Sequence, residues 1–318
     1  MRKGKAAIAH KPVASVQYEL RRTVQAARES SAVSHLLAYS NNADRHTLAA
    51  WIKAGVIGNV REVHNWTNRP FWPQGWQEYY KSGPPVPAGF NWALWQGPEP
   101  ERPYHPNYTH AVYRGWYAYG TGCLGDMGFY SLWQPYRILN LGVPEFVEAR
   151  PNNDAFVNEK NVSEGGVVSL VGFPNASTVR WRHPATPSRP SVDTFWYDGG
   201  MKPQTPEELY DDNEDLADEG LLLVGDKGKI LCDFRANKPR LIPRSRQSAF
   251  EGSVAVPDID TTTPEDEAEA VTIACIALRV PYKRLLWDSS KMEFTNSEAA
   301  TRLVRREHYR QGWEQPFA

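Results

Sequence analysis

The fold class is decided at the front of the chain, where residues 6–66 read AAIAHKPVASVQYELRRTVQAARESSAVSHLLAYSNNADRHTLAAWIKAGVIGNVREVHNW. Apolar stretches at 6–10, 33–39 and 60–66 have the length and composition of strands. Between them, apolar residues recur twice at helical spacing. The residues expected to cap these two helices are Ser15 and Asn42. Strands that alternate with helices over short connections are typical of parallel βαβ units, so we predict an α/β front.

This front is too short to be a complete dinucleotide-binding domain. Such a domain has two three-stranded halves, and the first half carries a glycine-rich turn between a strand and a helix. Only about two βαβ units fit into residues 1–65, and no strand with a glycine-rich turn precedes Lys11. We therefore predict residues 1–65 to be a partial Rossmann-like segment that corresponds to the second half of such a fold.

Residues 66–318 are predicted to form a larger, sheet-rich domain. After Pro144 the apolar pattern changes from helical to strand periodicity, and a turn at 225–228 joins the arms of a hairpin. The strands are expected at 145–150, 166–172, 178–183, 192–198, 220–224 and 229–234. The helices are expected from Gly125-Asp126 to Leu139, over about 264–279, and from Thr295 to about Tyr309.

The stretch 66–119 combines little regular periodicity with a high density of aromatic residues. A loop of this length in a compact domain is usually functional or disordered, and the aromatic content argues against disorder. The rings could fill a core, or they could line a cleft and pack against the C–H faces of a sugar. Both interpretations stay open. The candidate substrate-binding residues of this stretch are Trp72, His110, Arg114, Trp116 and Tyr117.

A glycine pattern at 120–125, Gly-Thr-Gly-Cys-Leu-Gly, matches the dinucleotide fingerprint G-x-G-x-x-G. That fingerprint requires a buried strand before it and a helix after it. The preceding residues 114–119 form a poor buried strand, and no βαβ unit follows. We therefore favour a close backbone approach that presents Asp126 at the start of a helix.

Composition excludes several functional classes. The net charge of -1 does not draw the molecule to nucleic acid or to an anionic membrane. No apolar run reaches the roughly 18 residues of a membrane-spanning helix, and the first residues lack the apolar region of a signal peptide. The three cysteines are widely spaced and fit no metal-ligand spacing. We predict a cytoplasmic protein without a metal site.

Lys11, Asp126 and Tyr130 are the residues best suited to acid–base chemistry. Lys11 ends a predicted strand, where ligands gather in open α/β sheets, and Asp126 and Tyr130 share one helix face. A lysine, a carboxylate and a phenol could together deprotonate an alcohol during hydride transfer. A surface lysine, a helix-start aspartate and a packed tyrosine would explain the composition equally well.

Several blocks lie in a familiar order along nearly the whole chain: His10-Lys11-Pro12, Trp51–Val60, Thr67–Pro70, Gly97–Tyr104, Gly120–Gly128, Trp196–Gly200 and Phe294–Asn296. In this order they resemble the glucose–fructose oxidoreductase, inositol dehydrogenase and rhizopine-catabolism family (Gfo/Idh/MocA). The likeness is greatest to long bacterial members with tryptophan-rich insertions.

The resemblance implies a Rossmann domain that binds NAD or NADP. It also implies a substrate domain with a large open, mainly antiparallel sheet that often forms the oligomer interface. The implied substrates are sugars, cyclitols or glycosides. His10-Lys11-Pro12 corresponds to the family's Glu-Lys-Pro motif beside the cofactor and keeps its catalytic lysine. Asp126 and Tyr130 correspond to its Asp-x-x-x-His pair, with the tyrosine that glucose–fructose oxidoreductase also has.

Two departures from the family pattern keep other functions open. The first βαβ units, with the glycine-rich turn and the ribose-binding acid, have no counterpart before Lys11, and the region before Glu265 is shortened. An oxidoreductase of this family is one hypothesis. The alternatives are a non-catalytic carbohydrate-binding or oligomerising module and a truncated reading frame.

Overall fold

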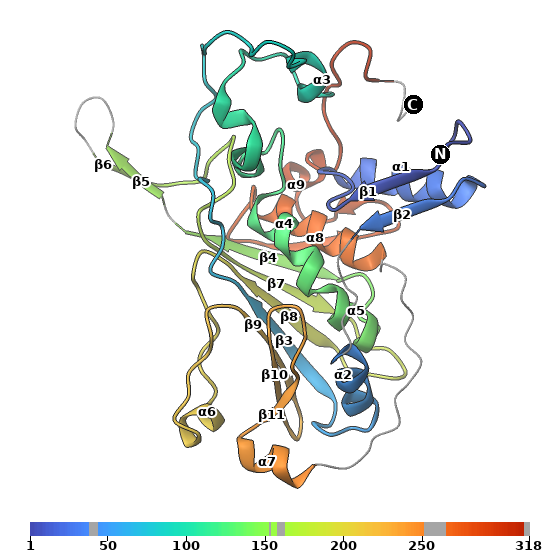
Figure 1. The fold of residues 1–318 in the computed structure, drawn as a ribbon, viewed down its shortest axis with the longest axis vertical. Helices are drawn as coiled ribbons and strands as arrows, with labels where there is room; N and C mark the ends of the chain where they lie inside the picture. Colours follow the sequence, from blue (N-terminus) through green and yellow to red (C-terminus); the bar gives the residue numbers. More distant parts are fainter. Residues whose placement is uncertain (38–43, 153, 158–162, 251–264, 315–318) are drawn as a thin grey trace.

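The computed structural model describes residues 1–37, 44–152, 154–157, 163–250 and 265–314. Within them the chain is a mixed α/β fold built on one nine-stranded sheet, with a two-stranded sheet at each side (Figure 1). The predicted fold class is confirmed, because a short parallel α/β front is followed by a large, mainly antiparallel sheet.

The front forms a small parallel sheet. β1 (Ala7–His10) and β2 (Ser34–Leu37) pair in parallel, and α1 (Gln17–Glu29) connects them as a βαβ unit. Ile8 and Val33 of this front are 75% and 76% exposed. The front therefore gains little stability from its own strands and is held mainly by the packing of α1.

The third strand predicted for the front lies in another sheet. β3 (Val60–Trp66) is parallel to β8 (Val192–Tyr197) and antiparallel to β9 (Gly220–Gly225), inside the nine-stranded sheet. The prediction that residues 60–66 extend the front sheet is wrong, because strand–helix alternation gives the order of elements but not the sheet that each strand joins. The division of the chain at residue 65 stays a prediction.

The large sheet has the strand order β11-β10-β9-β3-β8-β7-β4-β12-β13. Among the described residues β3–β8 is its parallel pair, and the other neighbours are antiparallel. Its remaining strands are β4 (Phe146–Pro151), β7 (Ser177–His183), β10 (Gly228–Cys232), β11 (Arg240–Ile242), β12 (Arg284–Asp288) and β13 (Glu293–Phe294). The strand expected at 166–172 is wrong for most of its length, because β6 (Ser163–Val167) ends at Val167. β6 pairs with β5 (Asp154–Val157) outside this sheet.

One face of the sheet is covered by helices. The other face is open over β7 and β8 but is covered beside β3 and β9, where Trp66 and Leu222 pack on Leu209. Along β7 and β8 buried and half-buried residues alternate strictly, as the two-residue period of a strand requires. The buried side meets α4 (Gly122–Ser131), α5 (Trp133–Leu139) and α8 (Glu265–Ala277), which lie over the sheet in Figure 1. Trp181 marks this layer, since its indole N–H donates to the Ala270 carbonyl of α8 at 3.0 Å.

The helix boundaries differ from the predictions at several ends. The N-cap position of α1 is Val16 rather than Ser15 and makes no side-chain cap, whereas Asn42 and the cap expected near 264 lie outside the described residues. The helix predicted from Asp126 begins at Gly122, and the last helix ends at Arg302, well before Tyr309. The other helices are α2 (Asp44–Lys53), α3 (Trp92–Gln96), α6 (Glu207–Asp211), α7 (Arg244–Ala249) and α9 (Glu298–Arg302).

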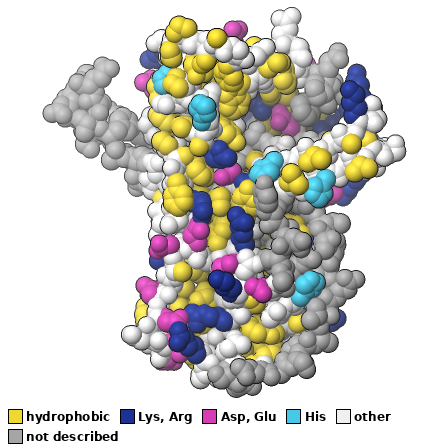
Figure 2. Space-filling model, viewed as in Figure 1, with side chains coloured by type: hydrophobic (Ala, Val, Ile, Leu, Met, Phe, Trp, Pro, Cys, Tyr) yellow, Lys and Arg dark blue, Asp and Glu magenta, His cyan; other side chains and the backbone are white. Residues whose placement is uncertain are grey.

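The aromatic stretch folds into a lobe with its own small core. Trp116 is fully buried there, stacked on Trp76 at 4.8 Å between ring centroids, and Tyr108 packs edge-on against it at the same distance. Figure 2 shows hydrophobic side chains gathered on the upper part of the viewed face, where Figure 1 places α3. The rings of this stretch therefore divide between the two interpretations. Many of them fill this core, and others remain available to line a cleft.

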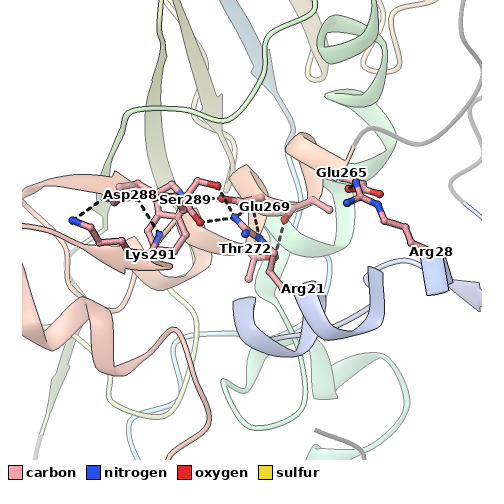
Figure 3. Close-up of polar contacts among 11 residues, drawn as sticks. Arg21, Arg28, Glu265, Glu269, Thr272, Asp288, Ser289 and Lys291 are labelled. Carbon is pink, nitrogen blue, oxygen red and sulfur yellow. Dashed lines mark hydrogen bonds and ion pairs between the residues drawn. The ribbon is translucent and has the colours of Figure 1, made fainter. Parts of the chain in front are cut away.

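α1 joins the front to the body through polar contacts with α8 and with the residue after β12. The Arg21 guanidinium donates to Glu269 of α8 and to Ser289 beyond β12, and Arg28 pairs with Glu265 at the start of α8 (Figure 3). These contacts fix the position of β1, whose carboxyl end carries Lys11. In the part of the chain that the structure describes, no helix is long and apolar enough to cross a bilayer.

Candidate active site

A cavity of about 470 Å³ lies where four parts of the chain meet. Its walls are the β1–α1 turn with the first turn of α1, the aromatic lobe, the first turns of α4, and Arg306 beyond α9. His10, Lys11 and Pro12 all line it, as does Asp126. The carboxyl end of a strand and the start of a helix are thus brought to one cavity, the usual location of ligands in α/β folds.

Lys11 is buried against Asp126. Its side chain is 2% exposed, and its Nζ donates to Asp126 Oδ1 at 2.8 Å and to the Asp126 backbone carbonyl. The same Nζ lies 4.0 Å from the centroid of the Tyr130 ring. The structure therefore brings together the three residues that the sequence proposed for acid–base chemistry, although 115 positions separate Lys11 from Asp126.

The surroundings lower the pKa of Lys11. Burial is the main cause, because it disfavours the charged ammonium, whereas the adjacent Asp126 carboxylate opposes it. Arg114 and Arg235 lower the pKa further by repulsion. A lysine with a lowered pKa can act as a base at a pH where an exposed lysine is fully protonated.

The glycines before Asp126 serve the packing of α4. A Cβ on Gly120 would lie 2.4 Å from the Arg114 carbonyl oxygen, and one on Gly125 would lie 2.3 Å from Thr121 Cβ. Gly122 has a φ of +64° and faces the Phe173 ring. The close backbone approach inferred from the glycine pattern is present, but Asp126 lies inside the helix rather than at its start.

The predicted substrate-binding residues are only partly in the cavity. Arg114 lines it, with Nε 3.2 Å from Asp126 Oδ1, and Trp72 lies beside Arg114 at 5.6 Å from ring centroid to Cζ. His110 is exposed and does not line the cavity, and Tyr117 packs on Phe173.

Trp116 is a correction to the predicted set. It has no exposed surface, and its indole N–H donates to the Asn107 carbonyl at 2.7 Å. Composition alone could not separate it from its neighbours, because rings in the lobe core and rings on its surface have the same residue types.

Sequence reasoning missed part of the cavity wall. The aromatic residues that line it are Trp95, Tyr113 and Tyr119, rather than Trp116 and Tyr117. Trp95 begins the last turn of α3, and its ring meets Tyr113 edge-on at 5.5 Å. The cap of α3, where Asn91 accepts from the Leu94 N–H at 3.0 Å, was a signal for this short helix.

The cavity has two charged ends. We call Lys11, Arg114 and Asp126 the lysine end, and Glu19, Glu99 and Arg306 the arginine end. At the arginine end, Arg306 bridges Glu19 at 3.0 Å and Glu99, and all three side chains are 10–12% exposed. Arg306 looks in sequence like a solvated helix residue. It lies instead beyond α9 and connects α1 to the aromatic lobe.

Asp198 supports α4 from the end of β8. It is buried, and it accepts from Trp196 Nε1 at 2.9 Å and from the Ser177 hydroxyl at 3.0 Å. Burial raises its pKa to about 7, while these bonds and one from the Cys123 thiol oppose the rise. Asp198 therefore joins two strands to the first turn of α4, three residues before Asp126.

No group of three or more histidine, cysteine, aspartate or glutamate residues within the described ranges could hold a metal ion.

The comparison with protein families supports the resemblance. Residues 46–141 match the family model GFO_IDH_MocA_C2, described as the oxidoreductase family's C-terminal alpha/beta domain. The matched segment contains Arg114, Asp126 and Tyr130, but not Lys11. No curated protein matches the chain in sequence.

Solved structures with a related arrangement are distant in sequence. An oxidoreductase from Thermotoga maritima is 14% identical, with a TM-score of 0.44 over 90% of this chain and 72% of its own. The WlbA dehydrogenase from Bordetella pertussis, solved with NADH and UDP-GlcNAcA, is 12% identical, with a TM-score of 0.48 over 90% and 73%. An oxidoreductase from Sinorhizobium meliloti is 14% identical, with a TM-score of 0.38 over 86% and 61%. The chain thus spans 61% to 73% of the length of these structures.

Proposed function

We propose that this chain provides the substrate-binding and proton-transfer part of an oxidoreductase site. Residues 46–141, which match the C-terminal domain model of the Gfo/Idh/MocA oxidoreductases, support this proposal. The reaction would be the oxidation of a hydroxyl of a sugar, cyclitol or glycoside, or its reverse, with NAD or NADP. The observation that carries the proposal is the contact of buried Lys11 with Asp126 and Tyr130 at the wall of the cavity.

Lys11 is the proposed acid–base residue. In the oxidation direction its neutral amine would accept the proton of the substrate hydroxyl, and in reduction the ammonium would return it. The lowered pKa favours the neutral amine more than in an exposed lysine. Asp126 would hold the amine in place through its carboxylate and its backbone carbonyl, and Tyr130 would be the alternative proton carrier beside Lys11.

The described residues do not fit a complete nicotinamide dinucleotide. The glycines at 120–125 contact protein atoms, and a 3₁₀ helix (His110–Gly115), rather than a strand, precedes them. The pattern therefore offers no open cradle for a pyrophosphate. A bound nicotinamide would act as the hydride acceptor or donor.

A carbohydrate-binding or oligomerising module without catalysis is the second candidate. The aromatic wall of Trp95, Tyr113 and Tyr119 favours it, because rings of this kind bind sugars without any cofactor.

The open face of the large sheet is the surface we propose for a second copy. It carries half-buried Phe195 beside the ion pairs of Asp193 with Arg180 and Arg182. Light scattering of the purified protein tests this, and a monomeric mass would contradict it.

The first experiment is a titration with NADH and NADPH, followed by nicotinamide fluorescence and tryptophan quenching. Saturation in the micromolar range would show that a nicotinamide site is present, and sugars and cyclitols would then be screened for turnover. Lys11→Met should lose turnover but keep cofactor binding, whereas Lys53→Met, at an exposed position in the last turn of α2, should change neither. The absence of binding up to millimolar cofactor would reject autonomous dehydrogenase activity and leave the binding module.

A further inference from the structure

Arg114 is held rigidly at the cavity wall. Its guanidinium carbon lies 4.8 Å from the centroid of the Tyr113 ring and 5.6 Å from that of Trp72. Its Nε lies 3.2 Å from Asp126 Oδ1. Two aromatic rings and a carboxylate therefore restrict the side chain, although the Arg114 side chain is still 29% exposed. A guanidinium restricted in this way loses little entropy when it binds a ligand.

One edge of this guanidinium remains available. Nε faces Asp126, and Nη1 donates weakly to the Ala111 carbonyl at 3.5 Å. Among the residues that the structure describes, Nη2 donates no hydrogen bond. Arg114 lines the cavity, so the available N–H groups can reach a ligand there. A planar pair of N–H donors suits a carboxylate, which accepts two parallel hydrogen bonds.

The two ends of the cavity differ in charge balance. At the lysine end one carboxylate, Asp126, serves both Lys11 and Arg114. At the arginine end, the two carboxylates are balanced by Arg306 and by Arg102, which lies 3.4 Å from Glu99. When Lys11 is protonated, the lysine end therefore carries two cations against one carboxylate.

We propose that the cavity takes a sugar acid, a polyol that bears one carboxylate, and that the free edge of Arg114 binds this carboxylate. The proposal rests on the proposed function and names the substrate class of the same cavity. The aromatic wall of Trp95, Tyr113 and Tyr119 would hold the polyol face, and Lys11 would meet a hydroxyl. A bound carboxylate would offset the excess charge of the lysine end, which a neutral sugar cannot do.

A carboxylate fits better than a phosphate. A phosphate ester carries close to two negative charges at neutral pH and usually requires several cations or backbone N–H groups. At the lysine end, one guanidinium edge is open, while Lys11 is held by Asp126. A single planar anion matches this arrangement.

Calorimetric titration without cofactor tests the proposal separately from catalysis. The ligands are glucuronate, methyl glucoside as its neutral counterpart, and glucose 6-phosphate. The wild-type protein should bind glucuronate about tenfold or more tighter than methyl glucoside, as expected for hydrogen bonds to charged groups. Glucose 6-phosphate should bind more weakly than glucuronate.

Three variants assign the preference to Arg114. Arg114→Gln should abolish the preference for glucuronate while the affinity for methyl glucoside changes little, and Arg114→Lys should restore only part of it. The matched control is Arg61→Gln, because Arg61 pairs with Asp226 away from the cavity, and it should keep the full preference. Thermal melts check that each variant is folded.

Equal affinities for the charged and neutral sugars would overturn the proposal, as would a preference that survives Arg114→Gln or a tighter complex with the phosphate. A protein that prefers glucuronate but never oxidises it with NAD or NADP would contradict the proposed oxidoreductase function instead.

Discussion

The two charged ends of one cavity show how similar residues can serve different purposes. Both combine carboxylates with cations at low exposure. At the arginine end Arg306 joins carboxylates from α1 and the aromatic lobe, and Arg102 completes the balance. At the lysine end one carboxylate is shared, and the pKa of Lys11 is lowered, chiefly by burial. A balanced cluster stabilises a junction, whereas an unbalanced one retains a group that can exchange a proton or bind an anion.

The largest effect should come from removing the proton carrier of the lysine end. Lys11→Met keeps the volume of the side chain but removes the amine, so turnover of a substrate found in the sugar screen should fall roughly 10²–10⁴-fold. Steady-state rates at saturating substrate measure this. A rate within threefold of wild type would show that Lys11 is not the acid–base residue.

A substitution at the arginine end should lower the unfolding free energy of the protein. Arg306→Met leaves Glu19 without its ion pair and Glu99 with only a more distant cation, at positions about 10% exposed. Breaking a buried pair in this way costs about 3 kcal/mol of unfolding free energy. Lys11→Met should cost less, because Arg114 remains on Asp126.

Urea unfolding measures that difference. The control for the arginine end is Arg302→Met, which removes an exposed pair with Glu298 and should cost less than about 0.5 kcal/mol. Equal losses for Arg302→Met and Arg306→Met would refute a structural role of the arginine end.

The stability of the protein should depend on pH through Asp198, which contacts the first turn of α4 near the lysine end. Its pKa is raised to about 7 when folded, from an ordinary value of 3.8, so the folded protein binds the proton more tightly. Its contribution to stability is therefore complete below pH 3.8 and is lost as the pH rises to about 7, by at most about 1.4 kcal/mol per pH unit.

Asp198→Asn should flatten this part of the stability–pH curve. The measurement is urea unfolding of both proteins between pH 4 and pH 8. An unchanged pH dependence in the variant would mean that Asp198 is ionised throughout this range in the folded protein.

The smallest expected effect is a shift of the pH–rate profile. Burial is the main cause of the lowered pKa of Lys11, and Arg114 adds to it by repulsion. In Arg114→Gln that repulsion is gone, so the limb of kcat/KM that reports Lys11 should move to higher pH. A shift to lower pH would show that Arg114 stabilises the ammonium rather than opposing it.

Much of the fold follows from local patterns. The strand periods of β4, β7, β8, β9 and β10, and the βαβ front, all appear in the sequence close to where they are predicted. The strands β5, β11, β12 and β13 were not predicted. β11 and β13 have only three and two residues, too few for an alternating pattern to stand out from a loop. The meeting of Lys11, Asp126 and Tyr130 was predictable as a hypothesis, and their chemistry stays a prediction, whereas the aromatic wall was not predicted.

The sequence by itself determined the α/β class, the position of Lys11 at the end of a strand, and a glycine-rich approach before Asp126. These features depend on residues close together in the chain. Only the tertiary structure decided that β3 joins the large sheet, that Trp116 is core while Trp95 lines the cavity, and that Arg306 reaches Glu19 and Glu99. Periodicity shows which face of an element is apolar, but the partner of that face depends on how distant segments pack.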